Sequence, residues 1–452
     1  MRALTASAIA VWSLLFAGRA WTSDPSDGDL WWQRALGEHI LRTHAIPREL
    51  GVTTYAAPHA PWIAQEWLFS SAFAWCVNHG FALEFRLALA ACAAATVALT
   101  AQRAAALGAG SIAGWAAVAS GIALLESFGV RGQVAAWPLL ALFLLLAERA
   151  GRSRFWALAV VAVWANVHAS VILAPLLAGC LLLDTRTALL ERFAFFAGVC
   201  LATLCTPFGI DLPLMAVHWS LDPDTAYIVE WRAPSFTDWS VLAGAVLPAI
   251  VVLAGVRARQ VTWAQRTIAA LLLVGMVLHA RNVATLAIAI VPYAAVVVAG
   301  MAGRRCAERP WSRSDAGLLA LAAAGAAIVG VQTARSPQPA YAARGAMDAV
   351  RVLPGAQRVY CENFDWCSLL ASDPRARVFL DGRLDAYPHA VFADWARVRA
   401  AAPGWEGGLA RNGTTALLAG SGGVLALAAG RSGRWEPVYS GAGITVFARL
   451  RE

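Results

Sequence analysis

Residues 26–40 read SDGDLWWQRALGEHI and directly follow an apolar run at residues 4–20. Beyond the two aspartates, apolar and charged side chains alternate at helical spacing and fall on opposite sides of one helix. The apolar side has Trp32, Ala35, Leu36 and Ile40, and the charged side has Arg34, Glu38 and Arg42. We therefore expect an amphipathic helix that lies in the membrane interface, just after a first membrane helix. A second such helix is expected within residues 66–80.

The composition of the 452-residue chain is that of a membrane protein. Hydrophobic residues make up 59% of it and charged residues 14%, which is more apolar material than a soluble chain of this length buries. All 36 basic residues are arginine, and they gather in short loops between apolar segments. Positive charge in such loops sets membrane orientation, and no basic stripe carries interleaved aromatic residues. We expect no nucleic-acid partner.

About eleven apolar segments are expected to be membrane helices. They cover residues 4–20, 83–101, 111–125, 134–148, 155–167, 169–183, 193–206, 240–255, 267–279, 283–302 and 315–333. The first segment could instead be a cleaved signal peptide, but the downstream pattern favours a membrane helix. With these spans, the arginine-rich loops share one side with the N-terminus, and the positive-inside rule makes that side cytoplasmic. The expected location is the bacterial inner membrane.

Nearly all acidic and histidine residues of the membrane half fall on the opposite, outer side, in the loops 21–82 and 207–239 and in short turns. Such clustering indicates a site that faces outward. The expected fold is mainly α. It consists of a polytopic helical membrane domain at residues 1–333, which includes the loop 21–82, and a small periplasmic α/β domain at residues 334–452.

The α/β domain is expected from strand-like runs at residues 358–361, 377–380, 416–419 and 444–448, which alternate with helical stretches. Asp381 and Arg383 follow the second run, where α/β domains commonly carry ligand residues. Acceptor binding, or closure over the membrane site, is one hypothesis for them. A structural turn is the other, and we favour it for Asp381. Cys361 and Cys367 either pair as a local disulfide or are two small buried residues.

Two interpretations of Asp27 and Asp29 stay open from the local sequence. In the first, Asp29 caps the interfacial helix and Asp27 is a solvated turn residue. In the second, one of them is a catalytic carboxylate. An aspartate that is partly desolvated beside Trp31 and Trp32 is suited to hold and deprotonate a hydroxyl.

The order of motifs along the outer loop is specific. The acidic pair and the interfacial helix are followed by Ile46-Pro47, Thr53-Thr54-Tyr55, Trp62, Glu66-Trp67 and Phe85-Arg86-Leu87. Further on, residues 164–170 form the polar turn WANVHAS. Roughly the first 200 residues thereby resemble the glycosyltransferase C (GT-C) superfamily, above all the branch with protein O-mannosyltransferases and the lipid A aminoarabinose transferase. This resemblance favours a catalytic role for the aspartates.

The resemblance implies a membrane glycosyltransferase that takes a sugar from a polyprenyl-phosphate donor at the outer face. It implies one inverting displacement, with Asp27 or Asp29 deprotonating the hydroxyl of a glycan, lipid or protein acceptor. Two positions depart from the family pattern. Gly28 stands where the acidic pair has its second member, and residues 62–67 replace a lysine-proline-proline element. These departures leave open which aspartate is the base and which group holds the phosphate.

A leaving phosphate needs positive charge or hydrogen-bond donors beside it. His168 and Arg281 are the preferred candidates, because each lies in a very short outer turn, where an ionisable side chain without a role is costly. The alternatives are a satisfied interfacial histidine and an arginine that reaches the lipid headgroups. The other candidates for substrate binding are Trp31, Trp32, Glu66, Trp67, Arg86, Arg131 and Glu230. Tryptophans also favour the membrane interface in any protein.

The sequence has no nucleotide phosphate-binding loop, dinucleotide fingerprint, zinc-spaced cluster or serine nucleophile motif. The sequence predicts no specific cofactor and no metal site. A divalent cation at the two aspartates remains an option, although two carboxylates are a thin ligand set. The alternatives to an enzyme are a transporter or flippase of lipid-linked sugar and a scaffold without catalysis. Transporters usually show two related halves and ionisable groups near the midplane, which this sequence lacks.

Overall fold

A computed structural model describes most of the chain. The described residues are 2–22, 28–149, 151–222, 231–235, 241, 245–255, 261–302, 312–313, 316–317, 319–321, 323–325, 327–328, 343–368, 370 and 373–450. Asp27, Glu230 and much of the segment expected at 315–333 lie outside them. Contacts divide the chain into two compact units, and each is described by itself.

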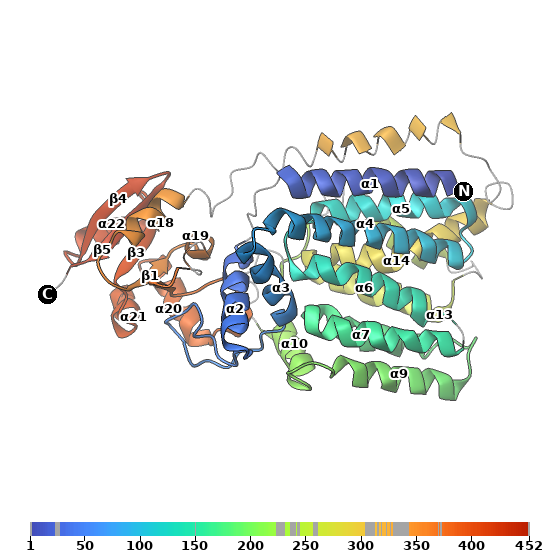
Figure 1. The fold of residues 1–452 in the computed structure, drawn as a ribbon, viewed down its shortest axis with the longest axis horizontal. Helices are drawn as coiled ribbons and strands as arrows, with labels where there is room; N and C mark the ends of the chain where they lie inside the picture. Colours follow the sequence, from blue (N-terminus) through green and yellow to red (C-terminus); the bar gives the residue numbers. More distant parts are fainter. Residues whose placement is uncertain are drawn as a thin grey trace. The chain divides into compact units, whose positions relative to one another are not determined.

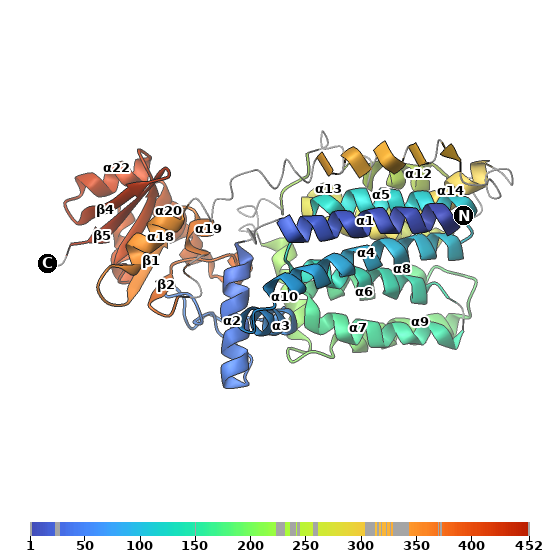
Figure 2. The same ribbon diagram turned by 45° about the horizontal axis from the view of Figure 1, so that its top comes forward.

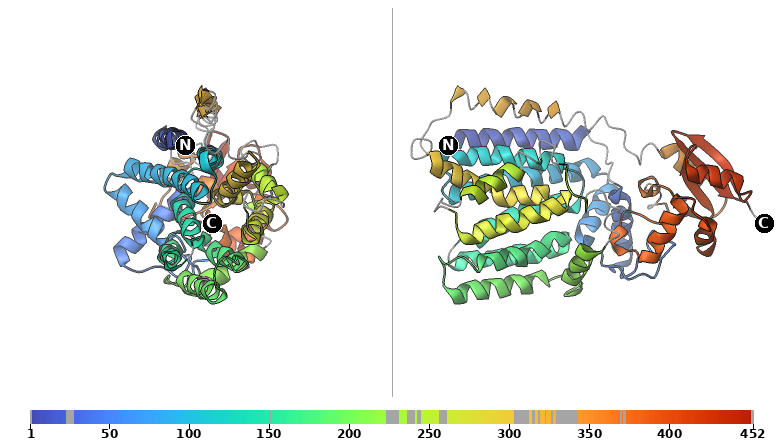
Figure 3. Two further views of the ribbon diagram at one scale, coloured as in Figure 1. Left: turned by 90° about the vertical axis from the view of Figure 1, so that its right-hand side faces the viewer. Right: turned by 180° about the vertical axis from the view of Figure 1, so that it is seen from behind.

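The first unit comprises Met1–Ser23, Phe81–His218 and Ala226–Arg335, and we call it the helical unit. Its helices lie side by side (Figures 1 and 3). They are α1 Arg2–Thr22, α4 Ala82–Ala106, α5 Ala113–Glu126, α6 Gly132–Ala147, α7 Trp156–Val167, α8 Leu173–Leu181, α9 Leu189–Thr203, α10 Asp211–Leu221 (ending in the second unit), α12 Leu247–Ala254, α13 Trp263–Leu278 and α14 Val283–Ala302. Short 3-10 turns lie at η1 Gly110–Ile112, η2 Arg152–Phe155, η3 Ala169–Ile172 and η8 Ala280–Asn282.

Every apolar segment predicted up to residue 302 coincides with or contains one of these helices. Among the described residues, three helical stretches are long and apolar enough to cross a membrane: Leu4–Trp21, Ala82–Ala106 and Ala280–Ala302. Several others are apolar but shorter. The structure therefore confirms a mainly helical chain, while the number of eleven membrane helices stays a prediction.

Small residues let α1 and α5 approach each other closely. A side chain at Gly114 would meet Leu4, and a side chain at Gly121 would meet the indole of Trp12. The two glycines are seven residues apart and thus share one face of α5. Apolar helices associate in lipid through such close packing, because burial of apolar surface drives little association there.

A buried ion pair links α4 to the residue that follows α6, and its arginine also reaches α14. Arg103 and Glu148 are 1% and 4% exposed, and Arg103 donates to both carboxylate oxygens at 2.7 and 2.8 Å. The Arg103 guanidinium also donates to the carbonyl oxygens of Ile288 and Ala289, at 3.1 and 2.7 Å. Pro292 explains this contact, because proline has no N–H to bond the carbonyl four residues earlier, at Ile288. Arg103 thus supplies the hydrogen bond that the proline removes.

The second unit comprises Asp24–Gly80, Trp219–Thr225 and Ser336–Glu452, and we call it the sheet unit. Its sheet has the order β2-β1-β3-β5-β4. Figure 2 shows β1, β2, β4 and β5 of this sheet. The strands are β1 Gln357–Cys361, β2 Ala376–Val378, β3 Ala416–Gly420, β4 Trp435–Gly441 and β5 Ile444–Arg449. We call the last stretch of this unit, Ser336–Glu452, the tail. Its helices are α18 Arg344–Arg351, α19 Phe364–Ser368, α20 His389–Arg399, α21 Trp405–Arg411 and α22 Val424–Arg431, with the short turn η9 Leu384–Ala386. β1 is parallel to β2 and β3, and β5 is antiparallel to β3 and β4.

Alternation along β1 builds a core on each face of the sheet. Val359 and Cys361 belong to the buried cluster that includes Met347 of α18. Tyr360 points to the other face, where its hydroxyl donates to the carbonyl oxygen of Trp395 in α20, at 2.8 Å. This is the two-residue period of a strand that is buried on both sides.

The loop at residues 21–82 extends this sheet. Tyr55 N–H donates to the Val378 carbonyl oxygen at 3.1 Å, and Val378 N–H donates to the Thr53 carbonyl oxygen at 3.0 Å. Residues 53–55 therefore lie beside the edge strand β2, with Thr54 paired in parallel to Val378. The loop helices are α2 Asp29–Thr43 and α3 Trp67–Asn78, and both match the two helices predicted for this loop. Contacts thus group residues 24–80 with the tail, whereas the sequence analysis placed them with residues 1–333.

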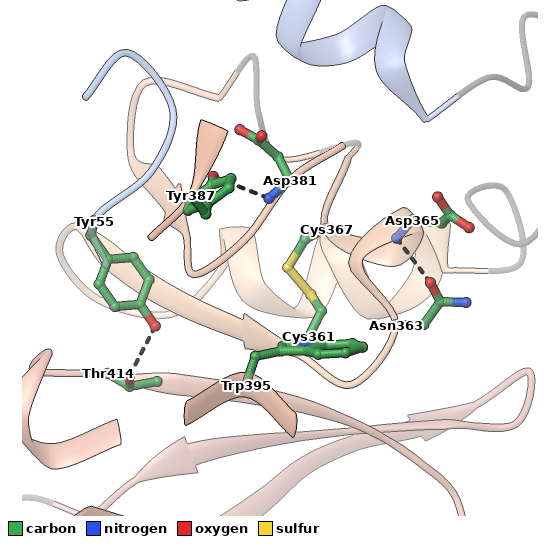
Figure 4. Close-up of a disulfide and its surroundings, with 9 residues drawn as sticks. All are labelled: Tyr55, Cys361, Asn363, Asp365, Cys367, Asp381, Tyr387, Trp395 and Thr414. Atoms are coloured by element: carbon green, nitrogen blue, oxygen red, sulfur yellow. Dashed lines mark hydrogen bonds between the residues drawn. A yellow bond between two sulfur atoms is a disulfide. The ribbon is translucent and has the colours of Figure 1, made fainter. Parts of the chain in front are cut away.

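Cys361 and Cys367 form a disulfide with a Cα–Cα distance of 5.9 Å (Figure 4). The bond joins the end of β1 to α19, and both cysteines are buried. The structure therefore decides between the two interpretations left open by the sequence in favour of a pair that is also part of the core. The free cysteines among the described residues all lie in the apolar segments or in the loop at residues 21–82.

Candidate functional site

Asp29 is the first helical residue of α2. Gly28 occupies the capping position, so Asp29 does not cap the helix as the structural interpretation proposed. Its Oδ1 accepts a hydrogen bond of 2.8 Å from the indole Nε1 of Trp32, one turn along the same helix. A carboxylate in the first turn is also favoured by the helix dipole. Asp29 is therefore held in one orientation by its own helix.

Gly382 of the tail lies against this carboxylate. A Cβ at position 382 would overlap Asp29 Oδ1 and would lie 3.2 Å from Trp32 Nε1. The backbone of the 381–383 turn thus approaches the hydrogen bond between Asp29 and Trp32 closely. A side chain at position 382 would therefore displace the Asp29 carboxylate from its present place.

Asp381 and Arg383, on either side of Gly382, form an ion pair of 2.7 Å whose side chains are 1% and 2% exposed. Thr53 donates to Asp381 Oδ2 at 2.5 Å and also bonds the Arg383 guanidinium. Arg383 further donates to the Leu50 carbonyl oxygen at 3.2 Å. The enclosed pair ties the turn to the loop at residues 21–82, and this geometry favours the structural interpretation of Asp381.

The charges of this pair stabilise each other. Burial alone raises the pKa of Asp381, but the Arg383 charge and the hydrogen bonds from Arg383 and Thr53 outweigh it and hold this pKa below its usual value. Burial likewise lowers the pKa of Arg383, while the Asp381 charge raises it above the usual value. Both groups are therefore charged at neutral pH.

Two indoles cover the Arg383 guanidinium. Its Cζ lies 4.4 Å from the ring centroid of Trp62 and 5.9 Å from that of Trp32. The two rings meet edge to face at 6.0 Å, and both tryptophans are buried. Trp32, predicted to bind substrate, therefore contacts Arg383 and Trp62 and lies away from the surface.

Glu66 and Trp67 lie at the start of α3. Glu66 is 7% exposed and accepts a hydrogen bond from Gln33 of α2. A side chain at Gly37 would overlap the carbonyl oxygen of Ser70, so the two helices cross closely one turn further on. Glu66 therefore helps to join α2 to α3.

Trp31 packs against the core of the sheet, and its indole N–H is buried without a partner among the described residues.

A second polar cluster lies in the helical unit, where the turns η3 and η8 and residues 231–232 meet. His168 is buried, its Nδ1 accepts from Ser170 N–H at 2.9 Å, and it lies within electrostatic reach of Arg281. The Arg281 guanidinium lies 4.9 Å from the ring centroid of Trp231, and His279 Nδ1 lies 2.7 Å from the Trp231 carbonyl oxygen. We call these residues the turn cluster.

Gln133, at the start of α6, donates to the Arg281 carbonyl oxygen at 3.3 Å and joins α6 to the turn cluster. Of the other predicted residues, Arg131 directly precedes α6, and Arg86 lies near the start of α4. The structure thus brings His168 and Arg281 together in one unit, and Asp29, Trp32, Asp381 and Arg383 together in the other. Sequence analysis did not single out Gly382, Gln33 or Gln133, because their roles come from neighbours far away in the sequence.

Among the described residues, no group of three or more His, Cys, Asp or Glu side chains is placed to hold a metal ion. Asp27 lies outside that part of the chain. The divalent cation considered at the two aspartates therefore stays an expectation from the sequence.

Comparisons of sequence find no relative: no protein-family model and no curated protein matches the chain. Comparisons of structure find several. The apo oligosaccharyltransferase of Archaeoglobus fulgidus superposes with a TM-score of 0.63 at 11% identity, over 99% of this chain and 74% of that one. Apo ArnT from Cupriavidus metallidurans gives 0.55 at 14% identity, over 99% and 97%. The arabinofuranosyltransferase AftD from mycobacteria gives 0.51 at 17% identity, over 100% and 40%.

These three proteins are glycosyltransferases of the GT-C type, and they include the lipid A aminoarabinose transferase named from the sequence. The resemblance is therefore confirmed by structure as a likeness of fold that extends over nearly the whole chain, well beyond the first 200 residues. The chain has the fold of the GT-C membrane glycosyltransferases.

Proposed function

We propose that the protein is a membrane glycosyltransferase that uses a polyprenyl-phosphate sugar as donor and a hydroxyl group as acceptor. The observation that carries the proposal is the GT-C fold over 99% of the chain together with the orientation of Asp29 by Trp32. ArnT from Cupriavidus metallidurans, which shares this fold, has also been solved with bound undecaprenyl phosphate. That structure supports a lipid phosphate as part of the donor.

In the proposed reaction the carboxylate of Asp29 accepts the proton of the acceptor hydroxyl. The acceptor oxygen forms a bond to the anomeric carbon as the bond from that carbon to the phosphate oxygen breaks. The configuration inverts in this single step, and polyprenyl phosphate leaves with the bonding electrons. Asp27 is the alternative base, because it belongs to the same acidic motif.

We assign the turn cluster the role of holding the lipid phosphate. Arg281 supplies positive charge, and its contact with the Trp231 ring holds the guanidinium in place. His168 lies close to it and is anchored by Ser170. A fixed cation beside the leaving oxygen stabilises the charge that develops there in the transition state.

We place the protein in the bacterial inner membrane, with the N-terminus and the arginine-rich turns in the cytoplasm. Arg152, in the turn η2, is one of these arginines. The positive-inside rule supports this orientation. The sheet unit, with its disulfide, is then periplasmic, where disulfides form and persist.

The test measures release of polyprenyl phosphate and transfer of sugar by the purified full-length protein, with a pool of polyprenyl-phosphate sugars and envelope acceptors. Asp29→Asn and Asp27→Asn are compared with Asp348→Asn, a surface carboxylate that is 71% exposed. We expect loss of transfer in one of the first two variants and wild-type transfer in the third. Movement of uncleaved donor across vesicles would indicate a transporter, and wild-type activity without either aspartate would refute the catalytic carboxylate.

The turn cluster has its own test. Arg281→Gln is expected to raise KM for the donor and to lower kcat, because the charge acts on the phosphate both in the ground state and in the transition state. Arg152→Gln, at an exposed arginine of the same unit, is the matched control. Unchanged kinetics in Arg281→Gln would refute the assignment.

A further inference from the structure

The tail touches the carboxylate of Asp29 in two ways, both through the 381–383 turn. Gly382 lies directly against Asp29 Oδ1. Arg383 lies over the Trp32 ring, and the Trp32 indole donates the hydrogen bond to the same oxygen. One turn therefore limits where the carboxylate can be and also supports the group that holds it there.

We propose that the turn Asp381-Gly382-Arg383 is a positioning element for Asp29, so that the sheet of the tail helps to set the geometry of the catalytic carboxylate. This inference rests on the proposed function, in which Asp29 is the base. It gives the tail a part in the chemical step that is separate from any binding of the acceptor.

The turn is rigid enough for such a role. Asp381 and Arg383 neutralise each other at 2.7 Å, and both side chains are buried. Thr53 bonds both of them, and Asp381 N–H donates to the Tyr387 hydroxyl at 3.2 Å (Figure 4). A residue held by several buried partners has few ways to move. Gly382, between them, is therefore held in one place and limits where the Asp29 side chain can lie.

The substitution Gly382→Ala tests the positioning of Asp29 separately from the folding of the sheet unit. The atom that it would displace is the far end of the Asp29 side chain, and Trp32 Nε1 at 3.2 Å is the next neighbour. A carboxylate moves by rotating about its side-chain bonds, which costs far less than shifting a backbone. Gly382→Ala is therefore expected to leave the sheet unit folded while it pushes Asp29 out of its hydrogen bond with Trp32.

The experiment compares Gly382→Ala with Gly430→Ala in the full-length protein. Gly430, in α22, has no atom within 4 Å of an added Cβ, so its substitution is a matched control. The first readout is the indole ¹⁵N–¹H spectrum of tryptophan-labelled protein in detergent micelles, with the Trp32 signal assigned by Trp32→Phe. We expect the signal to move in Gly382→Ala and in Asp29→Asn, and to stay in place in Gly430→Ala.

The second readout is transfer. We expect kcat to fall by at least about tenfold in Gly382→Ala, with KM for the donor unchanged, because small misplacements of a reacting group are costly. A Trp32 signal that stays at its wild-type position in Gly382→Ala overturns the inference. A moved signal with unchanged kcat also overturns it, provided that Asp29→Asn is inactive. Activity retained in Asp29→Asn refutes the proposed role of Asp29 itself, and the positioning role with it.

Discussion

Removal of the Arg103 side chain is expected to destabilise the helical unit strongly. Arg103→Met leaves the Glu148 carboxylate buried, and among the described residues the Tyr293 hydroxyl, at 2.5 Å, is then its remaining side-chain donor. It also removes the donor to the Ile288 carbonyl, which Pro292 leaves without its helical partner. Breaking a buried ion pair from one side costs about 3–5 kcal/mol. We expect a loss of stability in that range.

The double variant Arg103→Met/Glu148→Met is expected to be more stable than the single one. It leaves two buried neutral groups without a partner that they have in the wild type, the Ile288 carbonyl and the Tyr293 hydroxyl, but no unpaired buried charge. An unsatisfied neutral group costs about 1–3 kcal/mol. Pro292→Ala added to Arg103→Met restores an N–H at position 292 and should recover about 1 kcal/mol, a typical net hydrogen bond. The three variants thus separate the contribution of the charge from that of the proline.

The assay is reversible unfolding of the purified protein in mixed micelles with increasing SDS, followed by tryptophan fluorescence. Arg152→Met is the control, because Arg152 is an exposed arginine of the same unit. A cost below about 1 kcal/mol for Arg103→Met would contradict the reasoning from the buried ion pair. So would a double variant that is no more stable than the single variant.

Three further outcomes concern the sheet unit. Replacing both Cys361 and Cys367 by serine should lower its stability by about 2 kcal/mol, from the chain entropy of a short loop, and reductant should do the same to the wild type in a denaturant titration. Tyr55→Phe removes the 2.9 Å hydrogen bond to the buried Thr414 hydroxyl and should cost about 1 kcal/mol by the same titration. The pKa of Asp381 is lowered in the folded state, so the stability that its charge contributes is complete above the ordinary value of 3.8 and is lost as the pH falls below it. Asp381→Asn should therefore reduce the fall of the free energy of unfolding at acidic pH. An unchanged pH dependence would contradict this.

Much of the fold was predictable from local patterns. Apolar runs identified the helices of the helical unit up to α14, except α10, which lies in the predicted loop 207–239. Helical spacing identified α2 and α3, because burial of one face or of a whole segment leaves a periodic signal in the sequence. The strands β1, β3 and β5 were predicted as well. The predicted run 377–380 was too long, since Phe379 and Leu380 leave the strand and are buried in the turn region. β4 was missed because most of its side chains are exposed and Pro437 interrupts the strand pattern.

By itself the sequence determined the class of this protein and the types of group available to it. A chain this apolar needs a bilayer. The positions of its arginines, aspartates and tryptophans relative to the apolar segments indicate the loops and the membrane interface. Tertiary structure decided which of these groups meet. Residues 53–55 and 376–378 are far apart in the sequence, yet they pair along a sheet edge, and that pairing brings Gly382 to Asp29. No local pattern encodes this contact, because it depends on backbone hydrogen bonds and on the absence of a side chain at one position.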